Sequence, residues 1–363
     1  MRKINICFFS GDITRSGGTE RVAALIANEL NKDNNYNISF VSLTERREEP
    51  FFSLDAGIDR YKLYDKVTRG ATHILGYIHR LKNLVKKYNI EILVDIDGII
   101  DMYSIPVKWM TGVKVISWEH FNLYNHPNQK LREKVRRFAV KYLDAIVTLT
   151  EQDRDCYLSE LSFKCPIQAI YNPVTYTGID NKYNEQSKII MSVGRLTYQK
   201  GFDRLVEIAE LVLNKHADWK WLIFGEGEDR ETLEQMIVTK GLSDNLKLMG
   251  NVNDIDYRYN ESAMFVMTSR FEGLPMTLLE AKYYKLPIIS FDIKTGPKEC
   301  IIEGVNGYLI EENDNQTMAD RINNLIEDAE KRISFSEHAL EDTEKFETQK
   351  IVKQWKELFN IVI

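Results

Sequence analysis

The sequence contains no hydrophobic run of the roughly 18–20 residues that a membrane-spanning helix requires. The apolar segment near the N-terminus, Ile4–Ser10, soon meets Gly11 and Asp12. A secretory signal peptide needs a longer apolar core followed by a small-residue cleavage site. The segment therefore predicts a first β-strand, and neither a membrane span nor a secretion signal is expected.

Cysteine is also scarce, with four residues in a chain of 363. Their positions follow none of the spacings that zinc sites use. In a chain of this length they are expected to be reduced, mostly buried thiols of a cytoplasmic protein. The four are Cys7, Cys156, Cys165 and Cys300.

An excess of positive charge is missing as well, because the formal net charge is −6. Residues 1–172 hold 25 of the 48 Lys and Arg and 21 of the 54 Asp and Glu, which leaves 23 and 33 for residues 173–363. An acidic second half argues against nucleic acid as a partner. The slightly basic first half is compatible with an anionic surface or substrate, although small imbalances of this kind are common.

At roughly 100–200 residues per domain, the length predicts two domains. Short apolar runs alternate with amphipathic segments of helical period, which predicts parallel sheets covered by helices. The expected strands of the first half are Ile4–Ser10, Ile38–Leu43, Ile90–Ile96, Val113–Trp118 and Ala145–Leu149. The second half repeats the alternation from Lys188 onward, so the fold class is α/β with two doubly wound halves. Ligands of such sheets bind beyond the carboxyl ends of the strands.

A polar stretch separates the two halves. We expect an N-terminal domain at 1–172, a linker at 173–187, and a second domain at 188–345. The segment 346–363 has an apolar stripe at helical spacing and is expected to dock on one of the domains. The stripe consists of Ile351, Trp355, Leu358 and Phe359.

Two carboxylates, Glu272 and Glu280, are the most informative feature of the second half. Gly273 and Pro275 follow the first, and the segment from Met276 onward reads as a helix. Backbone N–H groups at a helix N-terminus favour anions, while carboxylates accept hydrogen bonds from hydroxyl groups. The combination suits a phosphorylated sugar or a nucleotide. Acidic residues that merely favour the helix dipole are the alternative.

Two glycine-containing loops follow predicted strands. Gly17 and Gly18 allow a sharp turn, and Thr19 is expected to cap the next helix. Their spacing differs from the dinucleotide fingerprint, and a plain strand-to-helix turn is the alternative. In the second half, Arg195 and Lys200 bring two cations to one loop, where they suit phosphate oxygens. Solvated loop cations are the alternative.

His120 follows a predicted strand of the first half, where a histidine is well placed to meet a substrate. A structural hydrogen-bonding role is the alternative. Three nearby acids, Asp95, Asp97 and Asp101, lack a companion ligand at metal spacing. No metal site is therefore expected.

The segment Lys130–Leu143 predicts a basic helix with one apolar face. That face is expected to pack on the sheet, and the basic remainder is a candidate contact with anionic lipid. The apolar residues are Leu131, Val135, Phe138 and Tyr142. The basic residues are Lys130, Arg132, Lys134, Arg136, Arg137 and Lys141, against one Glu133.

With these motifs in this order, the whole chain resembles the retaining glycosyltransferases of family 4. The resemblance is strongest to bacterial enzymes that build O-antigen, capsule or other surface glycans on polyprenyl-diphosphate carriers. It implies the GT-B fold, in which two Rossmann-like domains face each other across a cleft. The matching motifs are Gly17-Gly18-Thr19-Glu20-Arg21, Glu119-His120, Asn172-Pro173-Val174, Gly194-Arg195-(x)4-Lys200-Gly201 and Glu272-(x)7-Glu280.

The resemblance also implies roles for single residues. Arg195 and Lys200 match the pair that neutralises the donor's diphosphate. Glu280 matches the residue that binds the ribose hydroxyls, and Glu272 matches the acid at the hydroxyls of the donor sugar. His120 matches the histidine beside that sugar.

Backbone segments complete the implied donor site. Gly17 and Gly18 match the loop near the phosphate and the acceptor, and Val252 lies in the loop that matches the base-binding segment. The residues whose N–H groups would meet sugar and phosphate are Gly273, Leu274, Pro275, Met276 and Thr277.

The expected function is therefore transfer of a hexose or N-acetylhexosamine from a nucleotide sugar, expected to be a UDP-sugar, to a lipid-linked oligosaccharide at the inner membrane face. No metal or other cofactor is expected, because two cations and helix N–H groups stabilise the leaving diphosphate. A UDP-sugar 2-epimerase and a non-catalytic scaffold that binds nucleotide sugars remain the alternatives.

Overall fold

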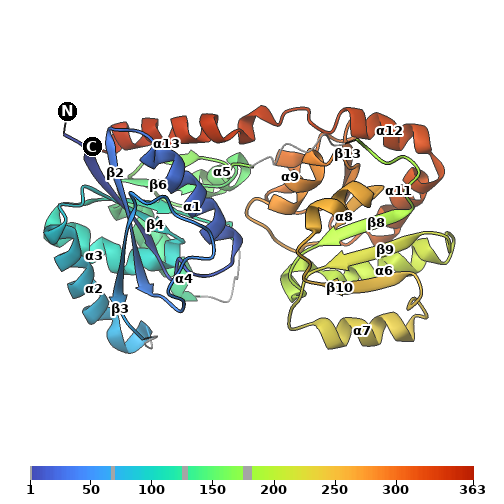
Figure 1. Ribbon diagram of the computed structural model, residues 1–363, viewed down its shortest axis with the longest axis horizontal. Helices are drawn as coiled ribbons and strands as arrows, with labels where there is room; N and C mark the ends of the chain where they lie inside the picture. The colour runs from blue at the N-terminus through green and yellow to red at the C-terminus, as the bar shows by residue number, and fades with distance from the viewer. Residues whose placement is uncertain (1, 67–69, 125–129, 175–181) are drawn as a thin grey trace. The chain divides into compact units, whose positions relative to one another are not determined.

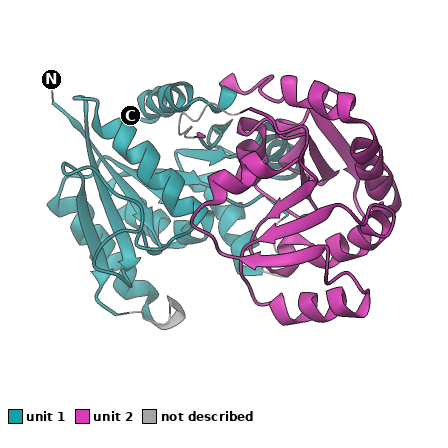
Figure 2. Ribbon diagram, turned by 45° about the vertical axis from the view of Figure 1, so that its right-hand side comes forward, with its two compact units in different colours: residues 1–173, 345–363 teal, residues 174–344 magenta. Residues whose placement is uncertain are grey.

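A computed structural model describes residues 2–66, 70–124, 130–174 and 182–363 (Figure 1). The chain divides into two compact units, which Figure 2 distinguishes by colour. Unit 1 consists of Met1–Pro173 together with Lys345–Ile363, and unit 2 consists of Val174–Glu344. Of the expected linker, residues 175–181 lie outside the described residues.

Unit 1 is built on a seven-stranded sheet in the order β3-β2-β1-β4-β5-β6-β7, and its strand pairs are parallel. The strands are β1 (Ile4–Ser10), β2 (Tyr36–Thr44), β3 (Asp59–Tyr64), β4 (Ile92–Ile96), β5 (Lys114–Trp118), β6 (Ala145–Thr148) and β7 (Ile167–Ala169). The order reverses between β1 and β4. In doubly wound sheets, ligands bind at the carboxyl ends next to such a reversal.

Helices cover both faces of this sheet. They are α1 (Gly18–Asn31), α2 (Gly70–Lys87), α3 (Asp101–Thr111), α4 (Lys130–Tyr142), α5 (Glu151–Glu160) and α13 (Thr348–Val362), with a 3₁₀ turn at Gly98–Ile100. On one face, Tyr77 of α2, Val107 of α3 and Ala139 of α4 join sheet residues such as Leu93 in one buried cluster. The hydrophobic effect of this burial holds the three helices to the sheet.

The helix α3 is not indicated by the sequence pattern. Its buried residues include Asp101 and Ser104, and Pro106 lies inside it. Polar residues on the buried side remove the apolar period by which an amphipathic helix is recognised. They are accommodated because they hydrogen-bond to other buried polar groups of unit 1.

The C-terminal helix α13 packs on unit 1. Its Trp355 ring lies 4.9 Å from the ring of Trp118 at the end of β5, measured between centroids. The Lys356 ammonium group lies 2.6 Å from the Asp33 carboxylate. All four residues of the predicted apolar stripe are buried. The chain thus returns to its N-terminal unit for its last helix.

Unit 2 holds a six-stranded sheet in the order β10-β9-β8-β11-β12-β13, again with parallel pairs. Its strands are β8 (Ile189–Val193), β9 (Lys220–Phe224), β10 (Leu246–Gly250), β11 (Met264–Met267), β12 (Ile288–Asp292) and β13 (Gly307–Glu311). The order reverses between β8 and β11. Both units therefore have the strand order of a Rossmann-like doubly wound sheet.

The helices of unit 2 are α6 (Phe202–Leu213), α7 (Arg230–Thr239), α8 (Ile255–Glu261), α9 (Met276–Tyr283), α10 (Pro297–Cys300), α11 (Asn315–Glu327) and α12 (Ala329–Glu337). Residues of α6 and α11, such as Leu205 and Ile322, share one buried cluster with Trp221 of β9. Each unit thus has a hydrophobic core of its own.

Candidate functional site

The loops after β8, β9 and β11 meet at the carboxyl edge of the unit 2 sheet. The amide of Leu196 donates to the carbonyl oxygen of Glu226 at 3.0 Å, and the amide of Arg270 donates to the carbonyl oxygen of Gln199 at 2.8 Å. The contact at Gly225 is tight: a Cβ there would lie 2.0 Å from the Gly194 carbonyl oxygen, and φ is +137°. Only glycine fits this crossing of the two loops.

Lys200 and Glu272 form an ion pair at this edge, although 72 residues separate them in sequence. The Lys200 Nζ atom lies 2.6 Å from Glu272 Oε1, and both side chains are largely buried. The Ser269 hydroxyl donates to the same carboxylate at 2.7 Å, and the Thr295 hydroxyl donates to the Glu272 carbonyl oxygen at 2.6 Å. These hydrogen bonds and the ion pair fix the positions of the Glu272 and Lys200 side chains relative to each other.

The predicted helix after Pro275 is α9, and Pro275 itself is its N-cap residue. Glu280, the fifth residue of α9, therefore lies just beyond the first turn, as the spacing indicates. Its Oε2 atom accepts a hydrogen bond of 3.0 Å from the hydroxyl of Tyr259. Tyr259 is buried and stacks on Tyr284 with ring centroids 4.9 Å apart. Burial and the Glu280 carboxylate raise the pKa of Tyr259 well above its usual range, so the phenol remains a donor.

The N-terminal turn of α9 contains the other residues expected to contact a donor. Leu274 and Pro275 are buried, whereas Gly273, Met276 and Thr277 are half-buried. The first N–H groups of a helix have no partner within it and carry the positive end of its dipole. The turn can therefore bind an anion.

Arg195 and Val252 lie on neighbouring loops of the same edge. Arg195 is exposed, and Val252 is half-buried. The loop of Val252 is joined to the loop after β9, because the Gly225 amide donates to the Gly250 carbonyl oxygen at 2.8 Å. Unit 2 thus brings Arg195, Lys200, Val252, Glu272 and the start of α9 to one edge of its sheet.

Gly17 and Gly18 lie in unit 1, at the start of α1. Gly17 is the N-cap residue with extended backbone, and a Cβ there would lie 2.3 Å from Glu20 Oε2. The prediction that Thr19 caps the helix is wrong, because the helix begins at Gly18 and has no side-chain cap. The buried Glu20 carboxylate occupies the space that a larger residue at Gly17 would need.

His120 follows β5 in unit 1 and is buried beside Trp118, with ring centroids 4.6 Å apart. Burial lowers the pKa of His120 to about 3, although the neighbouring Glu119 carboxylate acts in the opposite direction. The imidazole is therefore neutral at physiological pH. Its Nε2 atom has no hydrogen-bond partner within the described part of the chain.

Glu119 forms the centre of a buried ion-pair network. Arg136 of α4 donates to both Glu119 oxygens at 2.9 Å and to the Leu123 carbonyl oxygen at 2.9 Å. Arg132, one turn earlier, donates to Asp97 Oδ2 at 3.1 Å. Burial opposes the charge of Arg136, but the Glu119 carboxylate outweighs it and raises the guanidinium pKa. The network fixes the loop that holds His120.

These contacts correct the prediction for α4. Arg132 and Arg136 are buried rather than available to lipid, whereas Leu131, Phe138 and Tyr142 of the predicted buried face are exposed. The reason is that the buried side of the helix combines the apolar Val135, Ala139 and Val140 with two arginines that meet buried carboxylates. A buried carboxylate requires a partner, and arginine meets its two oxygens with a fork of donors.

Of the three acids discounted as metal ligands, Asp95 and Asp101 take part in buried hydrogen bonds. The Ser104 hydroxyl donates to Asp95 Oδ1 at 2.8 Å, and the Ser117 hydroxyl donates to Asp101 Oδ2 at 2.8 Å. Burial raises the pKa of Asp95 to about 7 and that of Asp101 well above its usual range. Among the described residues, no group of three His, Cys, Asp or Glu side chains is arranged to hold a metal ion.

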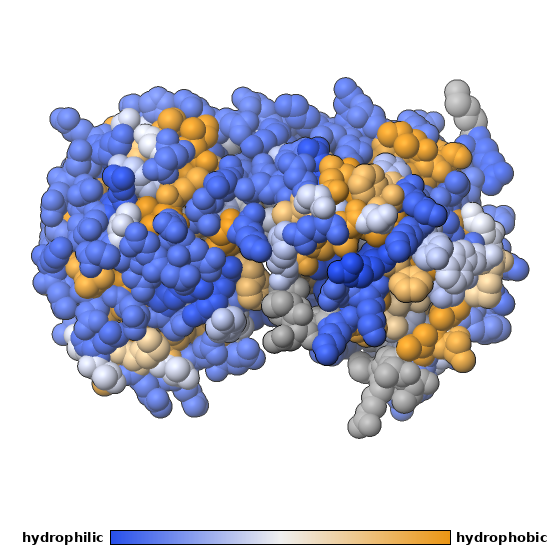
Figure 3. All heavy atoms as spheres, turned by 180° about the vertical axis from the view of Figure 1, so that it is seen from behind, coloured by the Kyte–Doolittle hydropathy of each residue, from blue (hydrophilic) through white to orange (hydrophobic). Residues whose placement is uncertain are grey.

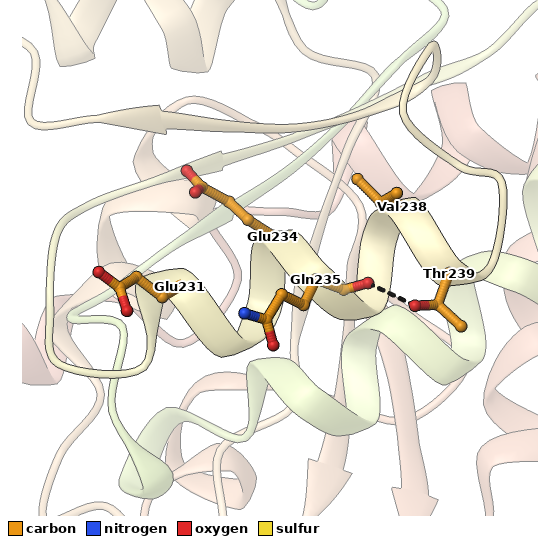
Figure 4. A pocket seen from close by; sticks show the side chains of 5 residues that line it. All are labelled: Glu231, Glu234, Gln235, Val238 and Thr239. Atoms are coloured by element: carbon orange, nitrogen blue, oxygen red, sulfur yellow. Dashed lines mark hydrogen bonds between the residues drawn. The ribbon is translucent and has the colours of Figure 1, made fainter.

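The surface hollow drawn in Figure 4 is separate from this edge. It runs along α7 and is lined by Glu231, Glu234, Gln235, Val238 and Thr239. The Thr239 hydroxyl donates to the Gln235 carbonyl oxygen within the same helix at 2.8 Å. None of the candidate residues lines this hollow.

Several residues of the site have no signal in the sequence pattern. Tyr259 lies on α8, a short helix without apolar periodicity, and Ser269 precedes the acidic motif by three residues. Arg270 pairs with Asp203 at 2.8 Å and covers the ring of Tyr198. Only their contacts in the folded unit connect them with Lys200, Glu272 and Glu280.

Comparison with known proteins identifies the family. The family described as "Glycosyltransferase Family 4" matches residues 16–176, and "Glycosyl transferases group 1" matches residues 179–342. A glycosyltransferase of Haemophilus influenzae with no assigned substrate is 31% identical over 98% of this chain and 99% of its own length. The chain belongs to glycosyltransferase family 4. The resemblance inferred from the motifs is thereby confirmed.

One further relative and one solved structure are also similar to this chain. An α-1,4-N-acetyl-D-galactosaminyltransferase of Campylobacter jejuni that acts on an undecaprenyl-diphosphate-linked glycan is 24% identical over 94% of this chain and 95% of its own length. A mutant of the S. aureus protein TarM, crystallised with UDP and α-GlcNAc-glycerol, superposes with a TM-score of 0.79 at 18% identity and covers 99% and 100% of the two chains. The glycosyltransferase has the GT-B fold, as expected.

Proposed function

We propose that this glycosyltransferase moves a hexose or N-acetylhexosamine from a UDP-sugar to a polyprenyl-diphosphate-linked oligosaccharide during synthesis of a bacterial surface glycan. The anomeric configuration of the sugar is retained, and no metal takes part. Support for the acceptor comes from the Campylobacter relative, whose substrate has this chemistry. Support for the nucleotide comes from the UDP bound by the structural neighbour.

The arrangement of Lys200, Arg195 and the start of α9 supports the proposal most directly. When the bond between sugar and phosphate breaks, negative charge develops on the departing diphosphate. Two cations and the N–H groups of a helix N-terminus stabilise that charge without a metal ion. Lys200 is positioned in advance by Glu272, at 2.6 Å, so little reorganisation is needed when the donor binds.

The two carboxylates are occupied in ways that argue against a glycosidase. A retaining glycosidase requires one free carboxylate as nucleophile and one carboxylic acid. Here Glu272 is paired with Lys200, and Glu280 accepts a hydrogen bond from Tyr259. On the family resemblance, Glu272 is assigned to the hydroxyls of the donor sugar and Glu280 to the ribose.

The proposed reaction is a front-face displacement. The bond from the anomeric carbon to the phosphate oxygen breaks, and the acceptor oxygen forms its bond on the same face. The acceptor hydroxyl gives its proton to the departing diphosphate, so no protein base is required. Neutral His120 is assigned a place beside the sugar as a hydrogen-bonding group rather than as a cation.

The lipid-linked acceptor places the reaction at the cytoplasmic face of the membrane. In the described part of the chain, no helix combines the length and the apolar character needed to cross a bilayer. Peripheral contact through basic residues of α4 is a separate part of the proposal. Arg132 and Arg136 are excluded from that contact, because they are buried in ion pairs.

Replacement of the two cations tests the proposal. Lys200→Ala is expected to lower kcat about 10²- to 10³-fold in a donor-saturated assay, because the leaving group loses one stabilising charge. Arg195→Ala tests the same charge at an exposed position, where the substitution is expected to leave folding intact. Lys188→Ala is the matched control, since Lys188 pairs with Asp218 in an exposed ion pair away from the site.

The assay supplies a panel of radiolabelled UDP- and GDP-sugars with a lipid-linked acceptor extract, and determines the anomer of the product. Near-normal turnover of both site variants would refute the assigned charge stabilisation. Conversion of a UDP-sugar without acceptor would indicate an epimerase instead. UDP binding without transfer to any acceptor would indicate a nucleotide-sugar-binding scaffold.

A further inference from the structure

A group of exposed hydrophobic side chains lies on α3 and α4 of unit 1. They come from the last turns of α3 and from the outer side of α4. The exposed fractions are 61% for Trp109, 46% for Met110, 56% for Leu131, 54% for Phe138 and 42% for Tyr142. Contiguous apolar surface of this kind on a soluble unit marks a site of interaction.

Three of these side chains, Trp109, Phe138 and Tyr142, are in contact with one another, and Met110 and Leu131 are exposed on the same two helices. The Tyr142 ring contacts Trp109 edge-on, with centroids 5.4 Å apart, and stacks on Phe138 at 5.7 Å. The surface therefore bridges the two helices. Beside the end of α4, the Lys164 amide donates to the Val140 carbonyl oxygen at 2.7 Å, which brings the exposed Phe163 alongside.

Basic residues share the exposed side of α4 with the aromatic ones. Lys130, Lys134, Arg137 and Lys141 are all exposed and follow one another at helical spacing. The one acid of the helix, Glu133, lies 2.9 Å from Arg137. Three lysines thus remain to give the surface a positive charge. We call the five hydrophobic and four basic residues the aromatic–basic face.

Contacts on the opposite side of α4 prevent the helix from rotating to bury the exposed hydrophobic residues. Arg132 and Arg136 are fastened to Asp97 and Glu119, and Val135 is buried between them. Rotation of the helix would leave these carboxylates buried without counter-charge. The ion-pair network therefore keeps three large hydrophobic residues of α4 in contact with water.

The residue types of the aromatic–basic face indicate the kind of partner that it binds. Trp and Tyr rings, with a polar edge on an apolar body, are favoured at the level of lipid head groups. Lysines and arginines are attracted to anionic lipids, and their aliphatic stems also bury apolar area. On the part of unit 1 visible in Figure 3, hydrophobic residues gather in several patches with hydrophilic residues between them.

From these observations we propose that the aromatic–basic face docks unit 1 on an anionic membrane surface. The rings enter the head-group layer, and Lys130, Lys134, Arg137 and Lys141 contact lipid phosphates. This inference rests on the proposed function, since a lipid-linked acceptor lies in such a surface. It differs from the sequence-based expectation, because it adds exposed hydrophobic residues of both α3 and α4 and removes the buried arginines.

Vesicle flotation of the full-length protein tests the docking. The vesicles contain phosphatidylcholine alone or phosphatidylcholine with phosphatidylglycerol. We expect binding to the anionic vesicles that weakens with salt. The double variant Lys134→Gln/Lys141→Gln is expected to bind at least tenfold more weakly, at about fivefold per basic residue. Trp109→Ser/Phe138→Ser is expected to weaken binding at all salt concentrations.

The control replaces two equally exposed hydrophobic residues of unit 2. Val238 and Tyr257 are 67% and 58% exposed, and Val238→Ser/Tyr257→Ser is expected to bind vesicles normally. Calorimetric titration with UDP separates this inference from the proposed function. The variants of the face are expected to bind UDP like the unchanged protein, because unit 2 holds the donor site.

Equal binding to neutral and anionic vesicles would overturn the inference, and so would normal flotation of both double variants. A dimer in solution that Trp109→Ser/Phe138→Ser dissociates, without vesicle binding, would also overturn it and assign the face to a second copy. Failure of UDP binding or sugar transfer with flotation unchanged would count against the proposed function alone.

Discussion

The replacement Arg136→Met tests the network that positions α4 and the loop of His120. Methionine keeps most of the aliphatic length but removes the guanidinium group. The change eliminates two charged hydrogen bonds to Glu119, both at 2.9 Å, and one each to the carbonyl oxygens of Leu123 and Phe121. The Glu119 side chain is only 2% exposed, so water cannot replace the lost partner.

The expected cost follows from this burial. Breaking a buried ion pair by removing one partner costs about 3–5 kcal/mol, because the other charge stays desolvated. Arg132 compensates in part, since its Nη1 atom lies 3.9 Å from Glu119 Oε2. We therefore expect about 3 kcal/mol, the lower end of the range, which is roughly 150-fold in the equilibrium for opening.

The neighbouring residue is a matched control. Arg137 is also an arginine of α4, but its side chain is 59% exposed. It forms an ion pair with Glu133, which lies four residues earlier in the same helix. Exposed pairs of this kind contribute about 0.3–0.5 kcal/mol. Hydrogen exchange of peptides covering β5 and α4 in the full-length protein measures both variants within unit 1.

Comparison of the Arg136→Met and Arg137→Met variants also distinguishes an effect on stability from an effect on membrane contact. Arg137→Met is expected to weaken flotation with anionic vesicles and leave exchange nearly unchanged, because Arg137 belongs to the aromatic–basic face. The double variant Glu119→Gln/Arg136→Met is expected to recover much of the lost stability, since the buried charge is gone. Equal exchange in the Arg136 and Arg137 variants would refute the reasoning.

Two further predictions concern single polar groups. Tyr259→Phe is expected to weaken UDP binding about fivefold with folding intact, because Glu280 loses a hydrogen bond. Calorimetric titration measures this affinity, and an unchanged value would contradict the prediction. Burial raises the pKa of Asp95 to about 7, so the folded state holds a proton that the unfolded chain releases above about pH 4. The free energy of unfolding should therefore fall as pH rises from about 4 to 7, and Asp95→Asn should flatten this slope in urea titrations; an unaltered slope would count against it.

Much of the fold follows from local pattern. The expected strand Ile4–Ser10 is β1 residue for residue, and Ile90–Ile96 overlaps β4, because buried parallel strands are short, nearly continuous apolar runs. The strand β3 was missed, since Asp59–Tyr64 has only one buried residue. The helix α3 was missed for the related reason that its buried side is partly polar.

The candidate site likewise has features that the sequence indicates and features that only the folded structure shows. The motifs of Arg195, Lys200, Glu272 and Glu280 are recognisable one by one in the sequence. The contact between Lys200 and Glu272 is not, because the pairing of β8 with β11 brings the two loops together. Tyr259 reaches Glu280 from a different helix, so no spacing could have indicated it.

The amino-acid sequence by itself determined the alternation of strands and helices, the two-unit α/β organisation and the family, because each depends on residues close together in the chain. Tertiary structure alone decided which side of α4 is buried. Apolar spacing placed Leu131, Phe138 and Tyr142 inside, yet the carboxylates of Asp97 and Glu119 required arginines there. A buried charge without a partner costs more free energy than a few exposed hydrophobic side chains, and the partner's identity depends on contacts that only the folded chain makes.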